Sequence, residues 1–387
     1  MKKILKKNQT ISLKWLISNV LVFLFLIATV MYLLYPGKED DSNEHIEFVL
    51  SMGAGWNLGN ALDSYGVGEN KKPIELYETF WGNPVITEDT ILAIKKAGFK
   101  TVRIPVTWYE HMDEDGKINV EWMDRVHDVV DYVVSNDMYA IIDIHHDKWT
   151  ETTNKNSTKA NIMLKNAWEQ IARRFSKYDE HLIFEAVNEP RMIGTDYEWN
   201  AGTADARKIV NSYNKTFVDT VRSVPGNSKR YLMVTPYGGS PEGEALKAMV
   251  LPEDERLILT VHGYKPYDFT HNKKGTSSWE RKNINDTKEI DEMMSNLDYY
   301  FIKKGIPVII GEFGAIDKEN LASRIAYTRY YVSRARSNNI MCIWWDDGWK
   351  QYPKGQFGIL DRYENKLMYP ELAKVLVEEQ PLPEGAE

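Results

Sequence analysis

Cysteine is almost absent from this chain of 387 residues, which contains only Cys342. A single cysteine forms no intrachain disulfide, and it leaves no thiolate cluster for a structural metal. Basic charge is also scarce, because six of the 48 Lys and Arg but only two of the 56 Asp and Glu lie in the first 40 positions, so the remainder carries a formal charge of −12. Such an acidic surface excludes nucleic acid as an expected partner.

Linkers and repeats are missing as well. After residue 42 the sequence has no Pro/Gly/Ser-rich stretch and no internal repeat, which argues against an appended binding module. With 43% hydrophobic residues, the chain is long enough for one large domain with a substantial core. We expect a single catalytic domain over residues 48–380, and we expect it to be a monomer.

Aromatic residues, by contrast, are abundant, with 12 Trp and 22 Tyr. Trp and Tyr combine an apolar face with a polar edge, which suits a groove in which sugar rings stack. The alternative is that most of these residues are ordinary core and surface residues.

The first 47 residues divide into three predicted segments. Residues 1–14 are rich in lysine, residues 15–35 are almost wholly apolar and uncharged, and residues 36–47 form a short linker that begins with an acidic turn. About 20 apolar residues span a bilayer as a helix, and flanking lysines stay in the cytoplasm. We therefore expect a transmembrane signal-anchor helix that places the rest of the chain on the extracellular side of the cell membrane. If the segment is a cleaved signal sequence instead, the protein is secreted.

Eight short apolar runs alternate with longer amphipathic stretches along the rest of the chain. Strands buried on both faces and separated by helices predict a parallel sheet, and eight such units close into a (β/α)8 TIM barrel of the α/β class. A doubly wound open sheet usually has a Gly-rich turn that leads into a helix, and Gly53-Ala54-Gly55-Trp56 does not. The predicted strands are 53–58, 101–106, 139–144, 182–187, 231–235, 257–261, 307–311 and 341–345.

Six helical patterns lie between these runs. Thr87 is placed to cap the first, and Gly98 and Gly305 are placed to end two of them. The predicted helices are 87–97, 120–135, 159–178, 204–224, 287–304 and 320–338.

Polar and ionisable side chains follow five of the predicted strands. The carboxyl ends of barrel strands meet at one rim, where this architecture carries its active sites, so we expect these side chains to converge. They lie in the segments Asp143 to Asp147, Glu185 to Pro190, His262 to Tyr264, Gly311 to Gly314 and Trp344 to Gly348.

Glu189 and Glu312 stand out because each follows a strand and has no lysine close to it in sequence. Glycoside hydrolysis needs such a pair: one carboxyl protonates the leaving oxygen while the other attacks the anomeric carbon, and a gap of about 5–5.5 Å gives retention. Their environments must push the two pKa values apart. Arg103 and Tyr264 could hold the Glu312 carboxylate, and Asn188 could hydrogen-bond the 2-hydroxyl of the sugar.

Six motifs in this order resemble those of family 5 glycoside hydrolases, and most of all the bacterial endoglucanases, a group that also includes lichenases and xyloglucanases. An ordered set across six strands is far more specific than any one tripeptide. The likeness covers residues 48–375. The motifs are Gly-Trp-Asn-Leu-Gly-Asn-Ala-Leu-Asp at 55–63, Val102-Arg103-Ile104-Pro105-Val106, Asn188-Glu189-Pro190, His262-Gly263-Tyr264, Gly311-Glu312-Phe313-Gly314 and Trp344-Trp345-Asp346.

The resemblance implies a retaining endo-β-1,4-glucanase (cellulase, EC 3.2.1.4) that needs no cofactor and acts on β-glucan. It makes Glu189 the acid/base and Glu312 the nucleophile. By the same match, the residues around the −1 sugar are Arg103, His145, Asn188, His262, Tyr264 and Trp345.

The histidines after the third strand have a second interpretation. His145, His146 and Asp147 could form a metal site with His262. We expect no metal, because neighbouring residues of a strand point to opposite faces. We predict instead that His145 contacts substrate or a catalytic carboxylate and that His146 reaches a neighbouring sugar.

Further contacts with substrate are predicted at the first and eighth strands. Trp345 is expected to stack under the −1 sugar, while the alternation of side chains turns Trp344 into the core. Asn57 and Asp63 are candidate contacts for sugars on the non-reducing side.

The preferred polymer stays open between β-1,4-glucan, xyloglucan, mixed-linkage glucan, xylan and mannan. A remote alternative is a surface protein that binds glucan without cleaving it, but such a protein would be expected to have lost one of the two glutamates.

Overall fold

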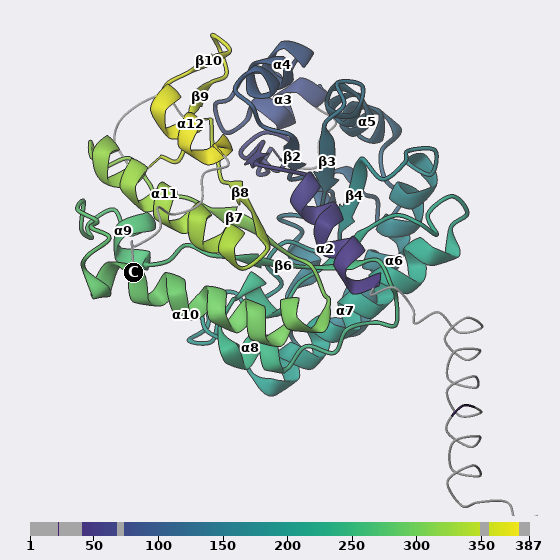
Figure 1. Ribbon diagram of the computed structural model, residues 1–387. Helices are drawn as coiled ribbons and strands as arrows, with labels where there is room; N and C mark the ends of the chain where they lie inside the picture. Colours follow the sequence, from purple (N-terminus) through teal and green to yellow (C-terminus); the bar gives the residue numbers. More distant parts are fainter. Residues whose placement is uncertain (1–21, 23–40, 68–72, 349–355, 379–387) are drawn as a thin grey trace, which may run out of the picture. The chain divides into compact units, whose positions relative to one another are not determined.

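The computed structural model describes residues 22, 41–67, 73–348 and 356–378, and the rest of the chain lies outside the description (Figure 1). The chain divides into two compact units, residues 1–44 and 45–387, and the second contains the predicted catalytic domain. Among the described residues, no helix is long and apolar enough to cross a membrane. The predicted segments 1–14 and 15–35 fall outside the described residues, apart from Val22.

Eight parallel strands form a closed barrel in the order β1 to β8, and helices surround it (Figure 1). Each strand overlaps one predicted apolar run, so the predicted (β/α)8 barrel is confirmed. The strands are β1 (Gly55–Asn57), β2 (Thr101–Ile104), β3 (Tyr139–Ile142), β4 (Leu182–Glu185), β5 (Leu232–Val234), β6 (Leu257–His262), β7 (Val308–Phe313) and β8 (Ile340–Trp344).

The six predicted helices are also present, each shifted by a few residues at most. They are α4 (Glu88–Lys96), α5 (Val120–Val134), α6 (Ser157–Arg174), α7 (Ala204–Ser223), α10 (Ile284–Tyr300) and α11 (Leu321–Ser337). Shorter described elements are α3 (Ile74–Thr79), α8 (Gly243–Lys247), α9 (Tyr267–Thr270), α12 (Pro370–Val377), β9 (Leu360–Asp361) and β10 (Lys366–Leu367).

The helix ends follow the sequence signals with one exception. Gly98 adopts a φ of 103° just after α4, and Gly305 adopts a φ of 77° at the end of the short 3-10 helix Ile302–Lys304 that follows α10, as predicted for stops. Thr87 does precede α4, but its side chain makes no capping hydrogen bond, so that detail of the prediction is wrong. Acidic residues in the first turn and lysines in the last turn of α4 instead complement the helix dipole.

Helix α2 (Asp41–Ser51) corrects the predicted linker, because it begins inside the range 36–47. From His45 onward it packs on the amino-terminal end of the barrel, where Phe48 stacks on Tyr231 with ring centroids 4.0 Å apart. Val49 and Met52 are buried in a cluster with side chains from the barrel interior. The folded domain therefore starts at least three residues earlier than predicted. The interior members of this cluster, here named the bottom layer, are Ile141, Ile183, Met233, Ile258, Ile309, Met341 and Ile343.

The barrel seam between β1 and β8 is held by residues near the carboxyl end of the chain. One carboxylate oxygen of Asp346 accepts hydrogen bonds from the Trp56 indole at 2.9 Å and from the Ile359 amide at 2.8 Å. Arg362 donates to the carbonyl oxygens of Gly59 and Asp346, each at 2.7 Å. The first and last strands are thus tied together through buried polar contacts.

Candidate active site

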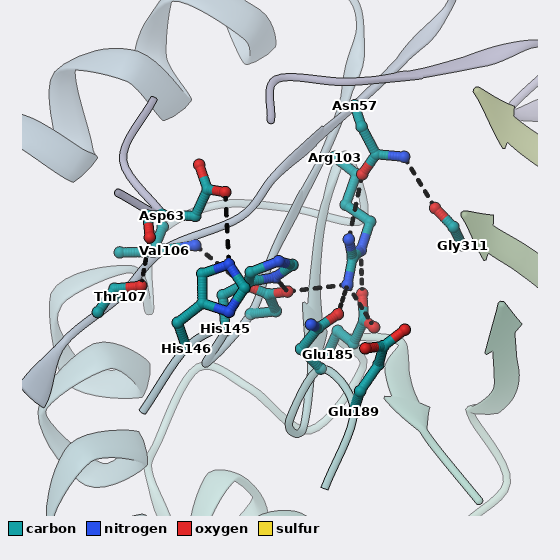
Figure 2. Close-up of polar contacts among 12 residues, drawn as sticks. Asn57, Asp63, Arg103, Val106, Thr107, His145, His146, Glu185, Glu189 and Gly311 are labelled. Atoms are coloured by element: carbon teal, nitrogen blue, oxygen red, sulfur yellow. Dashed lines mark hydrogen bonds and ion pairs between the residues drawn. The ribbon is translucent and has the colours of Figure 1, made fainter. Parts of the chain in front are cut away.

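Arg103 occupies the centre of the carboxyl-terminal end of the barrel, fully buried and surrounded by acids (Figure 2). Its Nε and Nη2 donate to Glu185 at 2.6 and 2.9 Å, Nη2 also donates to Asp143 at 2.8 Å, and Nη1 donates to Glu312 at 2.9 Å. Burial alone would lower the pKa of Arg103, but the charges of Glu185, Asp143 and Glu312 outweigh it and raise that pKa well above its usual value. The predicted contact between Arg103 and Glu312 is confirmed.

Asp143 and Glu185 are functional residues that the sequence analysis named only as members of the rim. Both are fully buried, and both orient the guanidinium that holds the Glu312 carboxylate. The signal that could have found them is an acidic side chain within or directly after an apolar strand, because a buried carboxylate needs a buried cation.

Asn57 corrects one predicted substrate contact. Its side chain is fully buried, its Nδ2 donates to the carbonyl oxygens of Gly311 and Trp344 at 2.9 and 3.3 Å, and its Oδ1 accepts from Arg103 at 3.1 Å. Asn57 therefore positions Arg103 and does not face the sugar. Asn188 also accepts from Arg103 through Oδ1, at 2.9 Å, which leaves its amide nitrogen as the group that could meet a hydroxyl.

Glu189 and Glu312 face each other across His262. The imidazole Nδ1 lies 2.7 Å from Glu189 Oε1 and 3.6 Å from Glu312 Oε2. One carboxylate oxygen from each glutamate and one ring nitrogen of His262 all lie within 4.8 Å of one another. The Tyr264 hydroxyl donates to the same oxygen of Glu312, Oε2, at 2.9 Å, as predicted from sequence. Two carboxyls from β7 and the loop after β4 are thus brought to one point of the rim.

The two carboxyls differ in pKa, as predicted, but the order is opposite to the one expected if Glu189 is the acid and Glu312 the nucleophile. Burial would raise the pKa of Glu189, yet the hydrogen bond and charge of His262 outweigh it and lower that pKa to about 2. Burial raises the pKa of Glu312 despite His262 and Arg103, which act to lower it. The pKa of His262 is raised, because Glu312 and Glu189 outweigh its own burial. These shifts favour a proton on His262 over a proton on Glu189.

A wall of rings lines the rim on the side of β8 and β3. The rings of His145 and Trp345 are parallel within 4°, with centroids 5.9 Å apart, and His145 Nδ1 lies 2.7 Å from Asp143. A Cβ on Gly59 would lie 2.6 Å from the Trp345 ring, so the indole rests directly on this glycine. Trp345 is partly exposed while Trp344 is buried, as the predicted alternation requires.

His146 extends this wall and changes the metal argument. β3 ends at Ile142, so strand alternation does not separate His145 from His146, and that reason for expecting no metal was wrong. Donor atoms of Asp63, His145 and His146 lie within 4.8 Å of one another (Figure 2). Asp63 is fully buried, which raises its pKa to about 7 and argues against direct contact with sugars. Asp147 belongs elsewhere, since its Oδ2 accepts from the Trp108 amide at 3.0 Å.

Comparisons with known proteins place this site among glycoside hydrolases. Residues 67–351 match the model of the family described as Cellulase (glycosyl hydrolase family 5). The chain is 40% identical over 336 residues to Endoglucanase A of Clostridium longisporum, an alignment that covers 86% of this chain and 65% of that relative.

Solved structures are similar along their whole length. A GH5-4 broad specificity endoglucanase from Ruminococcus champanellensis with bound cellotriose superposes with a TM-score of 0.82 at 41% identity, covering 86% of this chain and 98% of that one. A GH5 xyloglucan-specific endo-β-1,4-glucanase from a metagenomic library, in complex with cellotriose, gives a TM-score of 0.82 at 35% identity with the same coverage of both chains.

Proposed function

The chain belongs to glycosyl hydrolase family 5, and from that premise we propose that it is an endo-acting β-1,4-glucanase that retains the anomeric configuration. The observation that carries this proposal is the pair Glu189 and Glu312, whose nearest carboxylate oxygens lie within 4.8 Å of each other. That gap suits direct attack by one carboxylate and leaves no room for the water that an inverting enzyme holds between its two carboxyls.

The reaction proceeds in two displacements. Glu312 attacks the anomeric carbon and forms a glycosyl ester, while Glu189 gives its proton to the glycosidic oxygen and the shortened chain leaves as an alcohol. Glu189, now ionised, then removes a proton from water, whose oxygen attacks the anomeric carbon and releases Glu312. Atoms and charge balance over the cycle, and no cofactor is required.

His262 supplies the proton that Glu189 needs at the start. In the free site the lowered pKa of Glu189 and the raised pKa of His262 favour placing the shared proton on His262. The two groups are 2.7 Å apart, so the proton crosses to the carboxylate when a sugar displaces water and the low dielectric disfavours the separated charges. Arg103 and Tyr264 hold the Glu312 carboxylate in position for attack.

Around the −1 sugar, the proposed contacts are Asn188, His145 and Trp345, with His146 at the adjoining sugar. Trp345 presents a partly exposed ring beside His145, which suits stacking against the apolar face of a pyranose. The preferred polymer is soluble β-1,4-glucan, and xyloglucan is the second candidate, supported by the similarity to a xyloglucan-specific enzyme.

Residues 15–35 support a further proposal, a membrane anchor that displays a monomeric enzyme outside the cell. Fractionation tests it, since full-length protein in the culture medium and not in the membrane fraction would exclude the anchor.

Product stereochemistry tests the reaction directly. Proton NMR of cellopentaose during the first minutes of hydrolysis should show the β-anomer appearing before mutarotation. An initial α-anomer would exclude double displacement.

The variant Glu189→Ala tests the acid role. It should lose about 10²–10⁴-fold in kcat/KM on glucan and far less on an aryl cellobioside with a good leaving group, since only the glucan needs a proton donor.

A further inference from the structure

The loop between β4 and α7 exposes large apolar side chains directly after Glu189. Ile193, Tyr197 and Trp199 are 55%, 50% and 67% exposed. Single apolar side chains on a surface are common, but three within seven residues beside a catalytic group mark a contact surface. Among the residues that the structure describes, Trp199 is the one tryptophan with a largely exposed side chain.

This loop is fixed from beneath, so the exposure of Trp199 is not a consequence of a slack backbone. The Tyr237 hydroxyl accepts from the Met192 amide at 2.9 Å and donates to the Tyr197 carbonyl at 2.8 Å. Arg207 donates to the carbonyl oxygens of Ala201 and Gly202 at 2.9 and 2.7 Å. Both sides of Trp199 are therefore anchored to the barrel and to α7.

Arg191 connects Trp199 to the acid/base. Its guanidinium carbon lies 4.1 Å from the centroid of the Trp199 ring. The same guanidinium donates to the Glu189 carbonyl at 3.0 Å and to the Glu189 carboxylate at 3.4 Å, and Nε donates to Glu198 at 3.2 Å. Arg191 thus covers one face of the indole and leaves the rest of the ring open to solvent. The same guanidinium contacts Glu189, so it links the Trp199 ring to that glutamate.

The position relative to the catalytic pair defines which sugar could reach this ring. Glu189 must contact the glycosidic oxygen, which lies between the −1 sugar and the leaving group. The −1 side is occupied by the wall formed by His145 and Trp345, which comes from β3 and β8. Trp199 comes from the loop after β4 and lies on the Glu189 side of the pair, so it is placed beside the sugar that leaves.

We propose that Trp199, held by Arg191, is a stacking platform for a β-1,4-linked glucosyl unit on the leaving-group side of the cleaved bond. This inference rests on the proposed function and extends it to a subsite. A broad aromatic face with a covered back binds the apolar face of a pyranose at little cost in side-chain order. The alternative occupant of such a patch is a partner protein, which would have no effect on the hydrolysis of short oligosaccharides.

The test compares two substrates with the same glycone and different leaving groups. With cellohexaose, Trp199→Ala should lower kcat/KM by about two- to tenfold, mainly through KM, because the stacking energy of one ring is lost. For the release of p-nitrophenol from p-nitrophenyl cellotrioside, a cleavage whose leaving group is not a sugar, kcat/KM should stay within twofold. Trp199→Phe should restore part of the loss on cellohexaose, because a ring remains.

Tyr299→Ala is the matched control. Tyr299 lies on α10 and is 64% exposed, and its substitution also removes an exposed aromatic ring. It should change neither substrate, and all variants should keep the melting temperature of the parent. Equal losses on both substrates, or no loss on cellohexaose, would overturn the subsite while leaving the proposed function intact. A parent enzyme that cleaves neither substrate would refute the proposed function and this subsite together.

Discussion

The two ends of the barrel are built from opposite chemistry. At the amino-terminal end, helix α2 covers a bottom layer of aliphatic side chains with Val49 and Met52. At the carboxyl-terminal end, the same strands place Asp143, Glu185 and Glu312 around a single arginine. The amino-terminal end is stabilised by apolar burial. At the carboxyl-terminal end, the burial of charged groups costs folding free energy.

This contrast explains how a site with so much buried charge can persist. Buried ion pairs seldom add net stability, because desolvation offsets their attraction. The apolar end and the helices around the barrel must therefore provide most of the folding free energy. Changes at the two ends should separate activity from stability, in the following order of expected effect.

The largest effect is expected for Glu312→Gln, which removes the nucleophile and keeps the size of the side chain. The rate on carboxymethylcellulose should fall by about 10⁴-fold or more, because no covalent intermediate can form. Reducing-sugar release measures the rate, and thermal unfolding checks the fold. Glu292→Gln, on an exposed glutamate of α10, is the control and should be fully active. Activity in Glu312→Gln near that of the parent would refute the assignment.

The next effect is expected for Arg103→Met, which leaves buried carboxylates without their cation. The free energy of unfolding in urea should fall by about 3–5 kcal/mol, and hydrolysis should be lost as well. Arg174→Met removes an exposed ion pair with Asp124 and should cost less than about 1 kcal/mol. If the two variants are equally stable, the polar end does not depend on Arg103.

At the other end of the barrel, Met52→Ala should reduce stability without reducing the rate. Met52 is fully buried, so its truncation should cost about 2–5 kcal/mol in urea unfolding, while kcat stays unchanged because the site lies across the barrel. Leu50→Ala, on the exposed face of α2, should cost about 0.5 kcal/mol or less. A fall in kcat at a temperature where Met52→Ala is fully folded would show that the two ends are coupled.

The last change should leave the rate at neutral pH least affected, and it concerns the pH dependence of stability at the polar end. Burial raises the pKa of Asp147 to about 8, so the folded state favours the protonated carboxyl. Its contribution is complete below the unfolded pKa of about 4 and is lost as pH rises through 8. Asp147→Asn should remove that decline, so its stability relative to the parent should increase from pH 5 to pH 9 in urea unfolding. A constant difference over this range would mean that Asp147 is ionised in the folded protein.

The sequence predicted the barrel because all eight strands are buried on both faces and therefore read as unbroken apolar runs. It also predicted that Glu189 and Glu312 meet at one rim, because a carboxyl at the end of such a run has no structural reason to be there. Helix α2 escaped prediction since its first residues, Asp41 to Glu44, are polar and resemble a linker. Its apolar face becomes visible only where Phe48, Val49 and Met52 meet the barrel.

Other details of the site depend on contacts that spacing does not encode. The orientation of the Asn57 side chain is one example. Only the folded barrel shows that its amide points toward Arg103 on the neighbouring strand and away from the rim. The pKa order of the two glutamates likewise depends on which carboxyl His262 touches, and that contact joins residues 73 positions apart. A sequence indicates which groups meet at a rim, but not which pairs share a proton.

The seam held by Asp346 receives its last hydrogen-bond partners late in the synthesis of the chain. Glu189 and Glu312 are translated well before the segment 356–362, whose amides and Arg362 complete the junction between the first and last strands. A nascent chain that stops short of this segment already contains both carboxyls and all eight strands, and its β1 can pair with β8, but Asp346 still lacks the backbone donors that the later segment supplies. We therefore expect the ring to reach its full stability only when the final part of the message has been read.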